Sequence, residues 1–236
     1  MSKVILVTGA NSGIGLELAK LLAEQGHSVY AAARSQAGVE TIDALKTANL
    51  KSVQLDVTDV KSIIAAKDFI EKDAGHIDVL VNNAGDRVLS KPQVATNVDV
   101  AVVRAACEVN LFGLIQTTTT LLPLVLKSSK PNILNISTDM ASNTYQARPD
   151  SFLHVVAYNT SKAAANSYTI ALAHELKGKA IVNAVTPGRT TTKLNNYATG
   201  HGAKTPEEAA VLISKWVLEE EKSGLFIGPD GNEFPW

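Results

Sequence analysis

The sequence has little cysteine and almost no net charge, and each shortage excludes a class of protein. Cys107 is the only cysteine among 236 residues, so we expect no internal disulfide and no cysteine–histidine metal site. Because Cys107 lies in a stretch of helical pattern, we expect it to fill the core rather than to act as a nucleophile. With 22 basic and 23 acidic residues the net charge is −1, which gives no reason to expect nucleic acid or an anionic membrane as the main partner.

Long apolar segments are also scarce. We find no run that looks long enough to span a bilayer and no signal peptide ahead of the first apolar run, so we expect a cytoplasmic protein. What the chain does have is 45% apolar residues over a length that suits one large α/β domain, residues 1–236.

Short apolar runs alternate with segments of helical pattern along the whole chain. The runs are 3–7, 28–33, 52–57, 77–82, 132–137, 180–185 and 224–228. Helices are expected at about 16–25, 39–47, 60–73, 98–127 and 157–176, and after Thr205, which with Pro206 and Glu208 forms a capping box. Largely apolar strands that alternate with helices predict a doubly wound, mostly parallel seven-stranded sheet with helices on both faces.

A glycine-rich turn separates the first apolar run from the first helix. Gly9, Gly13 and Gly15 are spaced G-x-x-x-G-x-G, with Asn11, Ser12 and Ile14 between them. A strand, a glycine-rich turn and a helix together place a pyrophosphate at the N-terminus of the helix. The spacing differs from the general dinucleotide fingerprint G-x-G-x-x-G, so a turn without special function is the alternative.

Tyr158 and Lys162 lie four residues apart in a stretch that favours a helix, so they share a face. A free tyrosine has a pKa of about 10 and is a poor proton donor at neutral pH. A lysine ammonium at roughly 4 Å, with an effective dielectric of about 20, would favour the phenolate by about 4 kcal/mol. Such an interaction could lower the tyrosine pKa by up to about three units. The pair is therefore a candidate acid–base group, although the same spacing also occurs in helices without a catalytic role.

Together these motifs resemble the short-chain dehydrogenase/reductase family in its compact, single-domain, carbonyl-reductase-like form, and the resemblance covers essentially the whole chain. The other matching signals are Asn82-Asn83-Ala84-Gly85 after the fourth run, Asn110, the pair Ser137-Thr138 after the fifth run, and Pro187-Gly188 after the sixth. The resemblance implies a Rossmann-type fold, an NAD(P) cofactor, and interconversion of a carbonyl and an alcohol.

The resemblance also assigns roles to individual residues. Tyr158 would give a proton to the substrate oxygen, Lys162 would lower the tyrosine pKa and hold the nicotinamide ribose, and Asn110 would support a proton relay through water. The cofactor would be bound by Gly9, Asn11, Ser12, Gly13, Ile14, Gly15, Arg34, Ser35, Asp56, Val57, Asn83, Ala84, Gly85, Tyr158, Lys162, Pro187, Gly188, Thr190 and Thr192. No metal is implied.

The chain departs from the family pattern at the end of the second run. The acid that would bind the ribose hydroxyls of NAD is absent, and Ala33-Arg34-Ser35 stands there instead. An arginine can form a bidentate pair with a 2′-phosphate. We therefore expect NADP(H) as the cofactor; a solvated surface arginine is the alternative.

The second departure concerns the substrate-orienting hydroxyl. Alignment places Thr138 where the family commonly has a catalytic serine, and Ser137 remains the other candidate. The segment between Thr138 and Tyr158 is longer than in compact members and contains His154, which we expect to be an ordinary loop residue. The segment after Gly188 is short, which suggests an open substrate site.

We therefore expect an NADPH-dependent reductase of ketones or aldehydes that acts on a small molecule. The alternatives are an NAD(P)-linked alcohol dehydrogenase that runs the oxidation, and an NADPH-binding sensor or scaffold without turnover. The sequence leaves open the substrate, the stereochemistry, the physiological direction and whether the protein forms a homo-oligomer.

Overall fold

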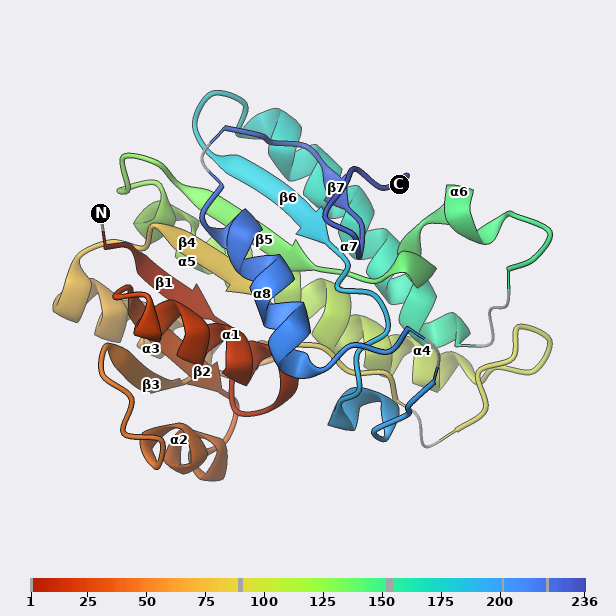
Figure 1. Ribbon diagram of the computed structural model, residues 1–236, viewed down its shortest axis with the longest axis horizontal. Helices are drawn as coiled ribbons and strands as arrows, with labels where there is room; N and C mark the ends of the chain where they lie inside the picture. Colours follow the sequence, from red (N-terminus) through yellow and green to blue (C-terminus); the bar gives the residue numbers. More distant parts are fainter. Residues whose placement is uncertain (1, 89–90, 152–154, 201, 220) are drawn as a thin grey trace.

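A single parallel sheet organises the computed structural model, which describes residues 2–88, 91–151, 155–200, 202–219 and 221–236. The sheet has seven strands in the order β3-β2-β1-β4-β5-β6-β7, and every pairing is parallel (Figure 1). The strands are β1 (Val4–Val7), β2 (Ser28–Ala33), β3 (Leu50–Gln54), β4 (Val79–Asn82), β5 (Asn132–Ile136), β6 (Ile181–Val185) and β7 (Phe226–Ile227). The predicted doubly wound fold is confirmed.

Helices cover both faces of the sheet because side chains along each buried strand alternate between the faces. Ile5 and Val7 of β1 join the core beneath α1 (Gly13–Glu24), α2 (Gln36–Asp43) and α8 (Pro206–Val217). Leu6 joins the opposite core, beneath α3 (Val60–Ala74), α5 (Leu114–Val125) and α7 (Val156–Glu175). Figure 1 shows α1 and α8 in front of the sheet and α5 and α7 behind it.

The strand order reverses between β1 and β4, which are neighbours in the sheet but far apart in sequence. The chain leaves both strands at the same edge, where the Thr8 N–H donates to the Val81 carbonyl oxygen at 3.0 Å. In open α/β sheets, ligands bind outside the carboxyl ends of the strands at such a reversal. A ligand site is therefore expected at the segments that follow β1 and β4.

The helix expected at 98–127 is one continuous helical stretch with an internal irregularity. It consists of α4 (Val100–Cys107), a π-helical segment η1 (Glu108–Gly113) and α5. By length and composition the stretch Val100–Val125 could cross a membrane, which corrects the expectation that the chain contains no such run. Here α4 packs against α7, and α5 packs against α3.

Several boundaries differ from those expected. The second helix begins three residues earlier than expected because the Ser35 hydroxyl caps it, accepting from the Gly38 N–H at 3.3 Å. The third strand, expected at 52–57, ends at Gln54, because Asp56 turns out of the sheet and its carboxylate accepts from the Thr58 N–H at 2.9 Å.

The capping box of the last helix is confirmed. The Glu208 N–H donates to the Thr205 hydroxyl at 3.2 Å, and the Thr205 N–H donates to the Glu208 carboxylate at 2.8 Å. The segments that follow β5 and β6 contain short helical turns, namely η2 (Asp139–Ala141) with α6 (Asn143–Gln146), and η3 (Lys193–Asn195).

Candidate active site

The turn between β1 and α1 accepts only glycine at two of its positions. Gly9 has a φ of +63°, and a Cβ there would lie 2.9 Å from the Ala84 Cα. A Cβ on Gly15 would lie 2.4 Å from the Asn83 Nδ2. That amide donates to the Thr8 and Gly9 carbonyl oxygens at 2.9 and 3.1 Å. Asn83 therefore braces the glycine turn from the end of the neighbouring strand.

The N-terminus of α1 lacks the cap that most of the other long helices have. Ser12 occupies the N-cap position in an extended conformation, but its side chain accepts no hydrogen bond from the helix. In α2, α3, α4 and α8, by contrast, the N-cap side chain accepts a hydrogen bond from a backbone N–H of the first turn. The first N–H groups of α1 thus have no side-chain acceptor, and together with the positive end of the helix dipole they form a binding place for an anion.

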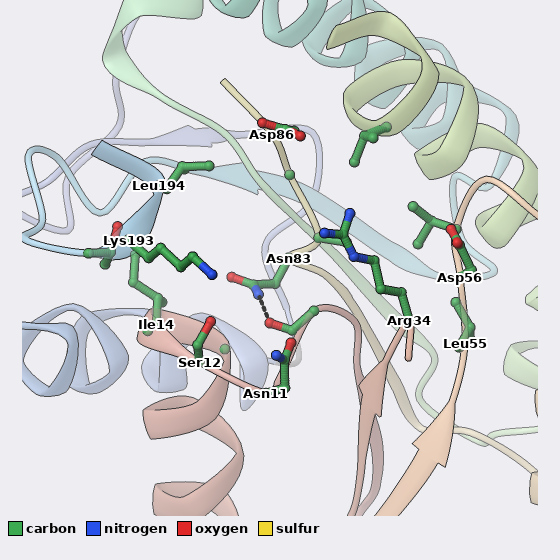
Figure 2. Close-up of a pocket in the computed structure, with 18 of the residues that line it drawn as sticks. Asn11, Ser12, Ile14, Arg34, Leu55, Asp56, Asn83, Asp86, Lys193 and Leu194 are labelled. Atoms are coloured by element: carbon green, nitrogen blue, oxygen red, sulfur yellow. Dashed lines mark hydrogen bonds between the residues drawn. The ribbon is translucent and has the colours of Figure 1, made fainter. Parts of the chain in front are cut away.

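A cavity of about 480 Å³ opens over this turn (Figure 2). Thirteen of the residues expected to bind the cofactor line it: Gly9, Asn11, Ser12, Gly13, Ile14, Gly15, Arg34, Asp56, Val57, Asn83, Ala84, Gly85 and Thr192. Sequence reasoning missed Leu55, Thr58, Asp86, Val109, Lys193, Leu194 and Asn196. Leu55, Thr58, Asp86, Val109 and Lys193 each adjoin a predicted residue, whereas Leu194 and Asn196 do not.

Two cations enter the cavity from different segments. Arg34 follows β2, and Lys193 comes from η3, whose Thr192 lies beside the glycine turn; a Cβ on Gly13 would be 3.4 Å from the Thr192 Cγ2. Figure 2 shows the side chains of Arg34 and Lys193 extending from separate elements of the wall. Within the described chain, neither cation forms an ion pair. Both charges are therefore available to an anionic ligand.

Six residues expected at the cofactor do not line this cavity: Ser35, Tyr158, Lys162, Pro187, Gly188 and Thr190. The Ser35 hydroxyl caps α2 instead. Pro187 and Gly188 lie in the turn after β6, where the Lys204 ammonium donates to the Pro187 carbonyl oxygen at 3.1 Å. Thr190 is buried and bridges to Lys204 in the same segment. Their expected contacts with the cofactor remain predictions.

Tyr158 and Lys162 are both buried on the sheet-facing side of α7, beyond the cavity. The Lys162 ammonium donates to the Ile136 carbonyl oxygen, at the end of β5, at 2.7 Å. Burial raises the pKa of Tyr158 to about 12 and lowers the pKa of Lys162 to about 8. The expected lowering of the tyrosine pKa is therefore wrong, because removal from water outweighs the positive charge of Arg87.

Gly85 connects the cavity to this buried pair. A Cβ on Gly85 would lie 3.2 Å from the Asn110 Oδ1 and 3.6 Å from the Lys162 Nζ. Asn110 lies in the π-helical segment, a distortion that is frequent at functional sites. Its amide donates to the Asp86 carbonyl oxygen at 2.7 Å and to the Ser161 hydroxyl at 2.9 Å. Asn110 thus ties the strand-ending segment to the helix of Tyr158; a relay through water remains a prediction.

The two candidate hydroxyls after β5 have different partners. The Ser137 hydroxyl donates to the Asn166 Oδ1, on α7, at 2.7 Å. The Thr138 hydroxyl donates to the Asp139 carboxylate at 3.1 Å and accepts from the Met140 N–H at 3.3 Å, which caps η2. Ser137 is therefore engaged with the helix behind the sheet, and Thr138 stands at the open end of the strand.

Gln93 is a further residue of the site that no sequence motif indicated. The N-cap residue of α7, Val155, has no capping side chain. The buried Gln93 takes over that function, since its Oε1 accepts from the Tyr158 N–H at 3.4 Å and its carbonyl oxygen accepts from the Val156 N–H at 3.1 Å. It thereby helps to fix the start of the helix that carries Tyr158.

Of the remaining predicted residues, Cys107 is partly buried in α4, and burial raises the pKa of its thiol. His154 lies outside the described residues. No group of three or more histidine, cysteine, aspartate or glutamate side chains within the described residues could hold a metal ion.

A glycine cradle at the strand reversal, with a tyrosine and a lysine buried beside it, defines a dinucleotide-binding α/β protein of the oxidoreductase class. A family model described as short chain dehydrogenase matches residues 3–201. The chain therefore belongs to the short-chain dehydrogenase/reductase family, as its motifs predicted.

Known relatives agree with this assignment. Short-chain dehydrogenase anuI of Penicillium roqueforti is 32% identical over 252 aligned positions, which cover 99% of this chain and 97% of that protein. The structure of NADPH-bound carbonyl reductase from chicken fatty liver is similar with a TM-score of 0.86 at 26% identity, over 100% of this chain and 99% of that one. The 3-ketoacyl-(acyl-carrier-protein) reductase of Brucella melitensis, complexed with NADH, has a TM-score of 0.84 at 28% identity, over 96% of both chains.

Proposed function

We propose that this oxidoreductase is an NADPH-dependent reductase that converts a ketone or aldehyde to an alcohol. One observation carries the proposal: the glycine cradle at the strand reversal reaches, through Gly85, the buried pair Tyr158 and Lys162. A cofactor in the cradle and a substrate beside Tyr158 would then meet at the end of β5. A reduced nicotinamide supplies the hydride and the electron pair in such a reaction.

The residues of the cavity fit a dinucleotide phosphate. The uncapped N-terminus of α1 suits a pyrophosphate, and the close packing around Gly9 and Gly15 leaves room for no side chain there. Arg34 stands where an NAD-binding protein would have an acid. Its guanidinium favours a 2′-phosphate, which supports NADPH over NADH.

Tyr158 would donate the proton that converts the carbonyl oxygen to a hydroxyl. Burial raises its pKa to about 12, so the phenol holds its proton at neutral pH, and proton donation would need a nearby positive charge that favours the phenolate. Lys162, with a pKa of about 8 caused by burial, is still mostly charged at pH 7 and would stabilise the phenolate that proton donation leaves. Thr138 would orient the carbonyl, and Asn110 would hold the segment that separates the two halves of the site.

Two other functions compete with this proposal. An alcohol dehydrogenase would use the same residues in the opposite direction, and the Brucella reductase was solved with NADH. A sensor without turnover would have no need for a buried tyrosine and lysine at the end of the cradle. The presence of both residues, with Arg34 at the ribose position, favours the NADPH-linked reductase.

A panel of ketones, aldehydes and alcohols, assayed with NADPH and NADH by nicotinamide absorbance, tests the proposal. Tyr158→Phe keeps the ring but removes the proton donor, and should lower kcat by about 10²–10⁴-fold while NADPH binding persists. Tyr168→Phe, further along the same helix, is the matched control and should keep the parent rate. A Tyr158→Phe protein that binds NADPH and retains more than a tenth of the parent kcat would refute the assignment.

A further inference from the structure

Arg87 is held beside the catalytic pair by an unusually constrained segment. Asp86, before it, donates its N–H to the Asn110 Oδ1 at 2.8 Å. After it, Val88 has a φ of +49°, a left-handed conformation that is rare for a β-branched residue. The Gln93 amide donates to the Arg87 and Val88 carbonyl oxygens at 2.6 and 3.0 Å. Backbone strain of this kind persists only where the surroundings fix it, and it clusters at ligand sites.

The Arg87 side chain lies over the aromatic ring of Tyr158. Its Cζ is 5.3 Å from the ring centroid, within the range of a cation–π contact. The Arg87 Nε is buried and has no hydrogen-bond partner among the described residues. Buried donors without a partner are rare, and each one calls for an explanation.

The carboxylates near Arg87 do not pair with its positive charge. Asp86 turns its carboxylate to the Val88 N–H, at 2.9 Å. The Asp139 carboxylate, whose negative charge helps to raise the pKa of Tyr158, accepts a hydrogen bond from the Thr138 hydroxyl. None of the ion pairs found in the described ranges includes Arg87. The positive charge therefore stands beside the tyrosine without an anionic partner among the residues that the structure describes.

We propose that Arg87 binds a carboxylate of the substrate, and that the preferred substrates are 2-oxo or 3-oxo acids. With its guanidinium over the Tyr158 ring, Arg87 lies beside a substrate whose carbonyl oxygen meets the Tyr158 hydroxyl. A carboxylate one or two carbons from the carbonyl carbon would then reach the guanidinium, whose fork matches carboxylate geometry. The proposal rests on the function proposed above, since it takes Tyr158 as the group that meets the carbonyl.

The test compares 2-oxobutanoate and 3-oxobutanoate with their uncharged methyl esters. With NADPH, the parent should favour at least one acid over its ester in kcat/KM by roughly ten- to a hundredfold, the range expected for a charge-assisted hydrogen bond. Arg87→Leu should abolish that preference, and Arg87→Lys should keep part of it. Arg104→Leu makes the same change at an exposed arginine of α4 and should retain the full preference.

Binding measured by calorimetry on the NADP⁺-saturated protein separates the two proposals. Arg87-dependent binding of an acid without turnover of any carbonyl would support the carboxylate site and refute the reductase. Reduction of the esters or of simple ketones, with acids neither bound nor preferred, would refute the carboxylate site and leave the reductase standing. A preference for acids that survives in Arg87→Leu would equally overturn the role of Arg87.

Discussion

The Lys162 ammonium donates a 2.7 Å hydrogen bond to the Ile136 carbonyl oxygen, at the carboxyl end of β5. This contact holds the lysine beneath the point where the chain leaves the sheet towards Ser137 and Thr138. A carbonyl oxygen satisfies one N–H of the ammonium but carries no full charge. Burial therefore remains the main influence on the lysine and lowers its pKa to about 8.

The first prediction is that Lys162 makes stability depend on pH. A lysine with the ordinary pKa of 10.5 titrates in the unfolded chain well above pH 8. Between the two values the unfolded state binds more protons, so this group makes the free energy of unfolding rise with pH, by up to about 1.4 kcal/mol per unit. Lys162→Met removes the titration. The stability of Lys162→Met relative to the parent should therefore fall between pH 8 and pH 10.

Urea unfolding of both proteins at pH 7, 8, 9 and 10 measures this difference. Lys215→Met, at an exposed position of α8, is the matched control and should show no such trend. A difference between Lys162→Met and the parent that stays constant with pH would mean that Lys162 keeps an ordinary pKa in the folded protein.

The second prediction concerns the arginine at the end of β2. Arg34 lines the cavity and has no ion-pair partner in the described part of the chain, so its charge is available to a 2′-phosphate. A charge-assisted hydrogen bond contributes about 1.5–3 kcal/mol, or roughly ten- to a hundredfold in affinity. Arg34→Ala should weaken NADPH binding by that factor and leave NADH binding nearly unchanged. Fluorescence titration with each reduced nucleotide measures both constants without any substrate.

Equal losses of affinity for the two nucleotides would show that Arg34 does not bind the 2′-phosphate. A parent protein that binds NADH more tightly than NADPH would contradict the assignment in the same experiment. Arg34→Lys keeps the charge without the bidentate fork, and it should fall between the parent and Arg34→Ala.

The third prediction concerns Lys193, which shares the cavity with Arg34 but comes from a segment beside the N-terminus of α1. From there its charge would act on a pyrophosphate, which both nucleotides contain. Because the side chain is exposed, we expect the lower end of the charge-assisted range, about 1.5 kcal/mol. Lys193→Met should therefore weaken NADPH and NADH about equally, by about tenfold. A loss of affinity confined to NADPH would instead indicate that Lys193 binds the 2′-phosphate.

The contrast between Arg34 and Lys193 shows what the sequence could predict. Arg34 was found because it follows a recognisable strand at a fixed distance from the glycine turn. Apolar runs predicted the seven strands, and the family pattern predicted thirteen cavity residues, Thr192 among them. Lys193 directly follows Thr192 but matches no motif position, and only the fold, which brings this segment beside the glycine turn, makes its charge part of the cavity.

Other features depend on tertiary contacts that no local pattern encodes. The pKa of Tyr158 is raised because the fold buries the phenol, whereas the sequence revealed only the neighbouring lysine. The π-helical segment around Asn110 interrupts a stretch whose composition suits an uninterrupted helix. Ser35 was assigned to the cofactor from its place beside Arg34; its hydroxyl caps α2 through a local contact, and its contact with the cofactor remains a prediction. For Tyr158, burial by the fold decided the outcome.

The last prediction decides which hydroxyl orients the substrate. The Ser137 hydroxyl donates to the Asn166 Oδ1 of α7 at 2.7 Å, whereas the Thr138 hydroxyl donates over the longer distance of 3.1 Å, and only to the adjacent Asp139. Neighbouring strand residues point to opposite faces, which leaves Thr138 at the open end of β5. If Thr138 orients the carbonyl, Thr138→Val should lower kcat/KM by about ten- to a thousandfold, since loss of one such donor costs up to about 4 kcal/mol in other enzymes.

Thr138 also caps η2, so a loss of activity could come from a disturbed turn rather than from the missing hydroxyl. Thr138→Ser keeps both the cap and the hydroxyl, and should retain most of the activity. Ser137→Ala should instead cost about 1–3 kcal/mol of stability, because it leaves the Asn166 amide oxygen buried without a partner, with little change in kcat/KM. The reverse order of losses would transfer the role to Ser137. Small losses in both would mean that Tyr158 alone holds the substrate oxygen.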